Sequence, residues 1–98
     1  MHIQTILQNI ANYYGVDHED VIKSPRGTRT LIKVRDIYFW VLSRLGQSHQ
    51  EIAQIGKRDR SSVTHSLIRT KRALKEDDLF RKEVLYFLSQ VQEDRVRL

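Results

Sequence analysis

The chain has 98 residues, a length that fits one domain with a modest hydrophobic core. It holds no cysteine, which excludes a disulfide framework, a cysteine zinc site and a thiol nucleophile. The formal net charge of +5 favours anionic partners, with nucleic acid first. No apolar run is long enough to span a bilayer, and the N-terminus lacks a signal-peptide pattern, so the cytoplasm is the expected compartment.

The first apolar stripe predicts a helix that ends at Gly15. Asp17 is suited to cap a short helical turn that runs through Val21 and Ile22. The residues of the stripe, which recur at helical spacing, are Ile3, Ile6, Leu7, Ile10, Ala11 and Tyr14.

Residues 23–30 have the composition of a basic loop, with Pro25 and Gly27 as turn residues. A long helix is expected to begin near Leu31 or Ile32 and to end before Gly46. Its three consecutive aromatic residues cannot all face inward, so partial burial is expected at Phe39 or Trp40. The predicted inward side consists of Val34, Ile37, Tyr38, Val41, Leu42 and Leu45.

Residues 48–75 have the pattern of a helix-turn-helix. Ser48 and Glu51 have the spacing of a capping box, and the short helix that they open ends at Gly56, where a tight turn would need a positive φ. A second helix begins between Asp59 and Ser62, and in this motif its N-terminal residues lie at base edges in the major groove. The second helix directs Val63, Leu67 and Leu74 inward.

A last helix is expected to begin in the acidic run 76–78, where acidic side chains suit the positive end of the helix dipole. Its predicted buried residues are Phe80, Val84, Phe87, Leu88 and Val91.

The basic residues fall into two blocks that acidic segments bound, which indicates one polarised face. Ordinary solvated helix faces remain the alternative explanation of the charge pattern. The first block holds Lys23, Arg26, Arg29, Lys33 and Arg35; the second holds Lys57, Arg58, Arg60, Arg69, Lys71, Arg72 and Lys75, with Asp59 as its one acid.

The start of the second motif helix carries the candidate DNA-binding side chains. Arg58, Arg60, Ser61 and Ser62 can donate to phosphates and base edges, whereas Asp59 can accept from a cytosine amino group. Asp59 or Ser61 could equally cap the helix, and the arginines could be solvated. One turn further on, His65 can reach a phosphate, and Arg69 is available outward on the same helix.

The segment 50–66, Gln-Glu-Ile-Ala-Gln-Ile-Gly-Lys-Arg-Asp-Arg-Ser-Ser-Val-Thr-His-Ser, resembles the signature of the DNA-binding C-terminal domain of the bacterial replication initiator DnaA. The similarity extends upstream to Tyr13-Tyr14, the short acidic turn and the basic loop that leads into the long helix. The resemblance implies the helical fold of that family, which is related to the Trp repressor.

The resemblance also implies a role for each matching position. Arg29 matches an arginine that enters the minor groove. Arg58, Asp59, Arg60 and Ser61 match the segment that reads the major groove. Ser62 and His65 match its neighbours that contact the DNA backbone, and Lys33 and Arg35 match positions near phosphates.

Several positions depart from the family pattern. Arg60 replaces a histidine, Ser61 and Ser62 replace a threonine pair, and Lys57 replaces a glycine after a helix that is one residue shorter. Arginine prefers guanine, and serine lacks the methyl that meets thymine, so the recognised sequence is expected to differ from the initiator's usual box. The Gly-x-x-x-x-Gly-Lys-Ser/Thr motif is missing, and with the Met1 start this favours a stand-alone relative that lacks the ATPase.

No catalytic or metal constellation emerges from the sequence. The four histidines lack metal-site spacing, and the acidic run 76–78 is better explained as a helix start than as a nuclease site. The sequence therefore predicts a single all-α domain of five to six helices over residues 1–98. Its expected partners are double-stranded DNA and a replication or regulatory protein, with no enzyme activity, cofactor, small-molecule substrate or membrane. The alternative is a protein-interaction module that docks through residues 79–91.

Overall fold

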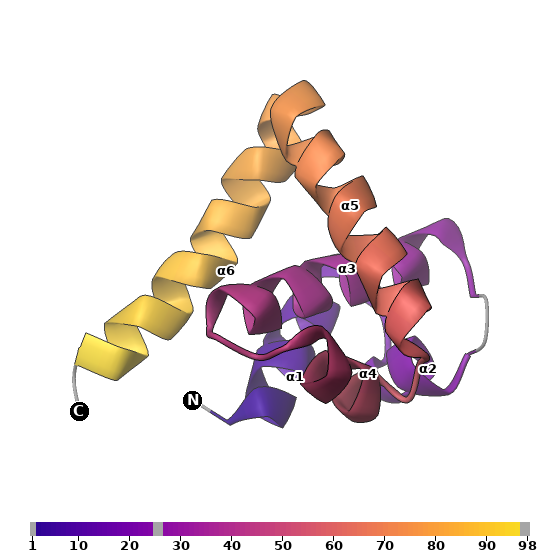
Figure 1. Cartoon of the computed structure of the whole chain (residues 1–98). Coiled ribbons are helices and arrows are strands. Elements are labelled where there is room, and N and C mark those ends of the chain that lie inside the picture. The colour runs from indigo at the N-terminus through magenta and orange to yellow at the C-terminus, as the bar shows by residue number, and fades with distance from the viewer. Residues whose placement is uncertain (1, 25–26, 97–98) are drawn as a thin grey trace.

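Six helices make up the part of the chain that the computed structural model describes, residues 2–24 and 27–96. That part contains no strand, so the predicted all-α class is confirmed. The short turn expected after Asp17 is a helix in its own right. In chain order the helices are α1 (Ile3–Tyr14), α2 (His18–Lys23), α3 (Arg29–Arg44), α4 (His49–Gly56), α5 (Arg60–Glu76) and α6 (Asp78–Val96) (Figure 1).

Helix α3 runs through the middle of the molecule and contacts each of the other five helices. Helices α5 and α6 meet at a sharp corner, from which α6 extends as a long arm (Figure 1). None of the described helices is both long and apolar enough to cross a membrane.

Side-chain caps explain where the short helices begin. The Asp17 carboxylate accepts a hydrogen bond from the Glu19 amide at 2.9 Å and so opens α2. Ser48 and Glu51 form the predicted capping box at the start of α4, with hydrogen bonds of 3.1 and 2.9 Å. These bonds satisfy amide groups that have no partner inside the helix.

Helix α3 begins earlier than the sequence pattern predicted. The Thr28 hydroxyl accepts from the Leu31 amide at 3.2 Å and caps the helix, which begins at Arg29, two residues before Leu31. Arg29, which was expected in the basic loop, therefore belongs to the first helical turn. Pro25 and Arg26 of that loop lie outside the described residues.

The predicted apolar stripes form the core. Helix α3 is buried on more than one side, because residues 34–39 are all buried, Arg35 and Asp36 among them. Phe39 is enclosed, and Trp40 is the aromatic residue that stays half-buried. Helix α1 contributes Ile6, Leu7, Ile10 and Ala11; helix α5 contributes Val63 and Leu67; and helix α6 contributes Phe80, Val84, Phe87 and Val91, with Leu88 and Leu74 half-buried beside them.

The turn after α4 takes its positive φ at Lys57 and not at Gly56, so the predicted role of Gly56 is wrong. Gly56 is the last residue of α4, and Lys57 follows with a φ of 53°. Glycine at position 56 instead makes room for an aromatic ring. A Cβ atom added there would lie 2.5 Å from Cζ of Phe39, which is closer than packed carbon atoms can approach.

Candidate nucleic-acid interface

Helices α4 and α5 form a helix-turn-helix in which the turn is held by the backbone. The Lys57 amide donates to the Gln54 carbonyl, and the Arg58 amide donates to the Ala53 carbonyl at 3.0 Å. Helix α4 packs against both α3 and α5, so it braces the second helix of the motif.

The first turn of α5 presents polar side chains to solvent. Asp59 is the N-cap, and its Oδ1 accepts from the Ser62 amide at 2.8 Å and from the Ser61 hydroxyl at 3.1 Å. These hydrogen bonds, the Ser62 backbone amide first, lower the pKa of the Asp59 carboxyl. Arg60, Ser61 and Ser62 are exposed in this turn, and His65 is exposed one turn further on.

Arg58 was predicted to read bases, but the structure directs its guanidinium toward helix α2. Nη2 donates to the Ser24 carbonyl at 2.6 Å, and Nη1 donates to the Ile22 carbonyl at 3.0 Å. Nη1 also lies 3.3 Å from the carbonyl oxygens of Gly56 and Lys57. Arg58 thus ties the turn of the motif to the carbonyl end of α2, a placement that argues against base contact.

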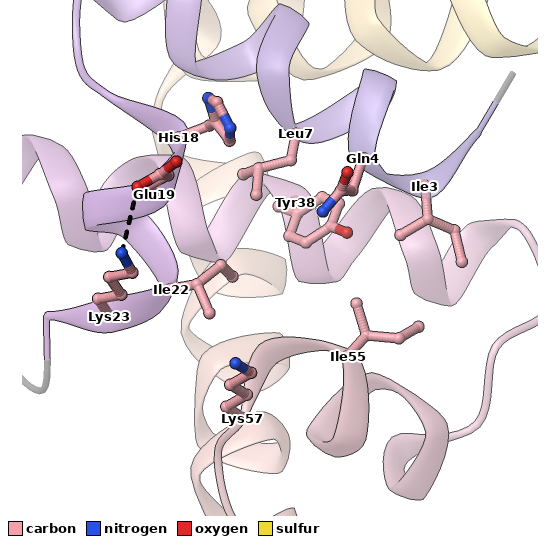
Figure 2. A pocket seen from close by; sticks show the side chains of 10 residues that line it. All are labelled: Ile3, Gln4, Leu7, His18, Glu19, Ile22, Lys23, Tyr38, Ile55 and Lys57. Atoms are coloured by element: carbon pink, nitrogen blue, oxygen red, sulfur yellow. Dashed lines mark hydrogen bonds and ion pairs between the residues drawn. The ribbon is translucent and has the colours of Figure 1, made fainter.

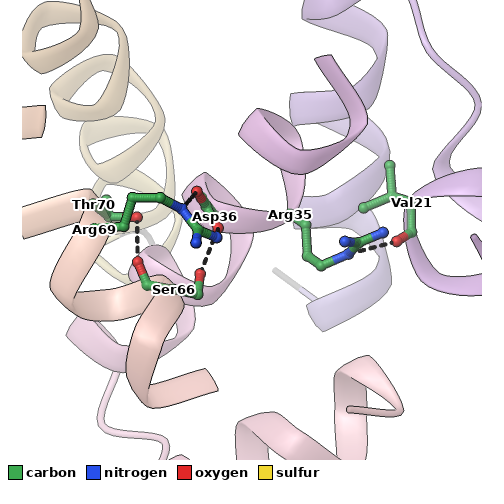
Figure 3. Close-up of polar contacts among 6 residues, drawn as sticks. All are labelled: Val21, Arg35, Asp36, Ser66, Arg69 and Thr70. Carbon is green, nitrogen blue, oxygen red and sulfur yellow. Dashed lines mark hydrogen bonds and ion pairs between the residues drawn. The ribbon is translucent and has the colours of Figure 1, made fainter. Parts of the chain in front are cut away.

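Arg35, predicted to lie near phosphates, is part of the interior. Only 8% of the residue is exposed. Nε donates to the Val21 carbonyl and Nη2 to the Ser24 carbonyl, both at 2.9 Å (Figure 3 shows the Val21 bond). Burial, and then the positive charge of Arg58, lower the pKa of Arg35. Two guanidinium groups therefore share the Ser24 carbonyl, and both stabilise the end of α2 rather than face solvent.

Lys33 faces helix α6. Its Nζ lies 3.5 Å from Oε1 of Glu83 and 4.7 Å from the centroid of the Tyr14 ring. Because the ammonium group of Lys33 lies over the Tyr14 ring of α1 and beside the Glu83 carboxylate of α6, its contacts link α3 to both helices. Lys33 is therefore engaged with α6, and it also lines a pocket with Arg29 and Arg69.

Arg29 and Arg69 are brought together although 40 positions separate them in the sequence. Both are exposed, and both line a pocket of about 290 Å³ between α3 and α5. Arg69 also lines a neighbouring pocket of about 240 Å³ with Ser62 and His65. The side chains of Arg29, Arg69, His65 and Ser62 consequently lie along one polar, basic face that leads to the first turn of α5.

A buried carboxylate, which the sequence analysis missed, holds Arg69 in place (Figure 3). Arg69 donates from Nε to Oδ2 of Asp36 and from Nη2 to Oδ1, both at 2.8 Å. The Ser66 hydroxyl donates to the same Oδ1 at 2.6 Å, and the Thr70 hydroxyl donates to the Ser66 carbonyl at 2.8 Å. The hydrogen bonds that Arg69 donates to the Asp36 carboxylate raise the pKa of Arg69. A sequence signal did exist, since Asp36 is the one acidic residue between Asp20 and Glu51.

Replacing Asp36 with alanine should destabilise the fold by about 2 kcal/mol, because Ser66 loses its buried acceptor and Arg69 its bidentate partner. The half-exposed guanidinium of Arg69 remains solvated, so the loss stays below that of a fully buried pair. Urea denaturation of the variant measures the change. Glu76→Ala removes an exposed carboxylate at the end of α5 and serves as the control. Equal stability of the two variants would contradict a structural role for Asp36.

The part of the chain that the structure describes holds no group of three histidine or acidic side chains placed to bind a metal ion. The Asp77 carboxylate accepts from the Phe80 amide at 3.0 Å, so within the acidic run at the start of α6 this residue caps the helix.

Comparison with known proteins gives one family. The model of the bacterial dnaA protein helix-turn-helix matches residues 3–69, a range that includes α1 to α4 and the first ten residues of α5. No curated protein matches the chain significantly. The matched range contains the exposed start of α5 together with Arg29, Asp36 and Arg69.

Proposed function

The chain belongs to the bacterial DnaA helix-turn-helix family, whose members bind DNA, and we propose that it recognises a specific duplex sequence through the N-terminal turn of α5 in the major groove. The family is a DNA-binding domain and not a catalytic one. One observation carries the proposal: the first turn of α5 exposes Arg60, Ser61 and Ser62 on a helix that α4 braces.

Asp59 can cap the helix and read a base at once. Its Oδ1 accepts from Ser61 and Ser62, which leaves Oδ2 to accept from a cytosine amino group. Arg60 is the residue that contacts guanine O6 and N7 in this proposal. Because Ser61 lacks the methyl group of threonine, a thymine contact present in the family pattern is weaker here.

Phosphate contacts complete the proposed interface. Ser62 at the end of the reading turn, and His65 and Arg69 further along α5, can donate to the DNA backbone. Arg35 and Arg58 support this surface from inside, since their guanidinium groups bind carbonyl oxygens at the end of α2. Lys33 is paired with Glu83 of α6 and lines a pocket with Arg29 and Arg69, so a role near the phosphates stays a prediction for this residue.

Arg29 is proposed to enter the minor groove from the first turn of α3. Arg29→Ala should weaken binding to the recognised duplex by about 1–3 kcal/mol and relax sequence preference at one end of the site. Fluorescence anisotropy with variant duplexes measures both effects. Arg44→Ala, at the opposite end of α3, is the matched control. Unchanged affinity and preference in Arg29→Ala would remove this role.

Selection from a randomised duplex pool tests the function as a whole. Binding at about 0.15 M salt suppresses nonspecific phosphate contacts, so a specific binder should enrich one motif. A motif that contains guanine where the initiator's box does not would agree with the Arg60 substitution. The absence of any enriched motif, with only weak and salt-sensitive retention, would refute sequence-specific binding.

A protein-interaction module is the second candidate function, and the outer face of α6 favours it. Leu79, Leu85 and Tyr86 of this helix are all exposed, by 68%, 56% and 49%. If this face is the functional surface, the selection experiment fails, and charge-neutral substitutions on α6 impair partner binding while Arg60→Ala does not. If DNA binding is the function, α6 could still hold a replication or regulatory protein, in replication initiation or in transcription regulation.

A further inference from the structure

A pocket of about 440 Å³ lies between α1, α2, α3 and α4, beside the turn of the helix-turn-helix (Figure 2). Its wall is apolar over much of its extent, where Ile3, Leu7, Ile22 and Ile55 line it. The volume falls in the lower part of the range that small-molecule sites occupy in proteins. The proposed DNA contacts use none of the residues that line it.

Tyr38 supplies an unused hydrogen-bonding group to this pocket. The residue is only 1% exposed and belongs to the core, yet it is one of the residues that line the cavity (Figure 2). Its hydroxyl makes no hydrogen bond with any of the described residues. Because Tyr38 lines the pocket, its hydroxyl is available to donate a hydrogen bond to an oxygen atom of a ligand bound there.

The charges around the pocket leave one cation without a partner. Lys23 is paired with Glu19 at 3.2 Å, and His18 lies 3.8 Å from Asp17. Lys57 is exposed at the edge of the pocket and has no ion-pair partner within the described part of the chain.

The backbone at Lys57 is also unusual, because it adopts a φ of 53° that glycine would accommodate at lower energy. Although this backbone conformation is higher in energy for lysine than for glycine, the lysine side chain can make a contact that glycine could not.

We propose that this pocket binds a small organic anion, a monocarboxylate with a compact apolar body. Lys57 pairs with the carboxylate, the Tyr38 hydroxyl donates to a ligand oxygen, and the apolar wall of Ile3, Leu7, Ile22 and Ile55 covers the body of the ligand. Binding at this site does not depend on the proposed DNA binding.

The position of the pocket gives the ligand a route to the helix-turn-helix. Lys57 belongs to the turn, and the Ile22 carbonyl accepts the hydrogen bond from Arg58 that ties this turn to α2. A bound anion would therefore contact both sides of that connection and stabilise it, as any ligand that binds only the folded state does.

Titration of the full chain with 3-phenylpropionate, followed by methyl NMR spectra, tests the site directly. The expected result is a set of saturable shifts at the methyl groups of Ile3, Leu7, Ile22 and Ile55, at ligand concentrations up to about 10 mM. The melting temperature should rise with the concentration of the probe. An absence of saturable shifts at these methyl groups would overturn the proposal.

Matched variants separate the anion contact from apolar packing. Lys57→Gln should weaken binding of the probe by about tenfold, because a charge-assisted hydrogen bond is lost, and Tyr38→Phe should weaken it less. Lys82→Gln removes an exposed cation of α6 and should leave the affinity unchanged. The neutral analogue 3-phenylpropanol should bind more weakly than the acid. Equal binding of alcohol and acid, or unchanged affinity in Lys57→Gln, would refute the assigned anion site.

Discussion

Replacing Arg60 with alanine is expected to weaken binding to the selected duplex by about 1–3 kcal/mol, since a bidentate contact with guanine is lost. The side chain is exposed in the first turn of α5 and makes no hydrogen bond with the residues that the structure describes, so its removal should leave the fold intact. Affinity for the selected duplex and for a scrambled duplex should therefore converge. Fluorescence anisotropy at fixed salt measures the difference.

Arg60→His provides the sharper version of this experiment. Histidine is the residue of the family pattern at this position, so the variant should shift the selected motif toward the initiator's usual box. Lys82→Ala, which removes an exposed cation of α6, controls for the loss of overall positive charge. If Arg60→His selects the same motif as the original chain, direct readout by Arg60 is excluded.

Gly56→Ala is expected to destabilise the fold by about 1–3 kcal/mol, as overpacking of a filled core does. The added methyl group would lie 2.5 Å from Cζ and 2.6 Å from Cε1 of Phe39, a ring that is itself 1% exposed and cannot move into solvent. Elsewhere in helices the same substitution stabilises, because alanine has the higher helix propensity. The midpoint of urea denaturation measures the sign and size of the change.

A second substitution shows whether the Phe39 ring is the cause. Phe39→Leu removes ring atoms from the position that the new methyl group needs, so the two substitutions together should cost less than the sum of their separate effects. Gln54→Ala, on the exposed side of α4, should be close to neutral. Simple additivity in the double variant would contradict the clash with Phe39.

Much of the helical framework could be predicted because its signals are local. The capping box of Ser48 and Glu51 and the stop at Gly15 each depend on residues within one turn. The apolar stripes of α1 and α6 follow helical periodicity and were correctly expected to be buried. Helix α3 begins earlier than its apolar pattern predicts, because the Thr28 side chain caps it directly after the basic loop.

The candidate site was less predictable, because an arginine side chain can either be exposed to solvent or form hydrogen bonds inside the protein. In the sequence, Arg58 and Arg60 are two positions apart and chemically alike. In the structure, Arg60 is exposed, whereas Arg58 donates to carbonyl oxygens of α2 that lie 34 and 36 positions away. A planar group with several donors can satisfy backbone carbonyls as well as phosphates, and its charge alone does not reveal the partner.

Sequence alone was sufficient for the all-α class, the helix-turn-helix and the family, since each depends on short-range spacing or on a contiguous motif. It could not reveal the buried bond of Asp36 with Arg69, the space that Phe39 takes beside Gly56, or the pocket between α1 and α4. These features depend on residues that are 17 to 54 positions apart in the sequence. Phe39 packs beside Gly56, Asp36 bonds to Arg69, and Ile3 and Lys57 line the same pocket. Packing of this kind is a property of the assembled core, where each side chain's environment is set by its neighbours in space and not by its neighbours in the chain.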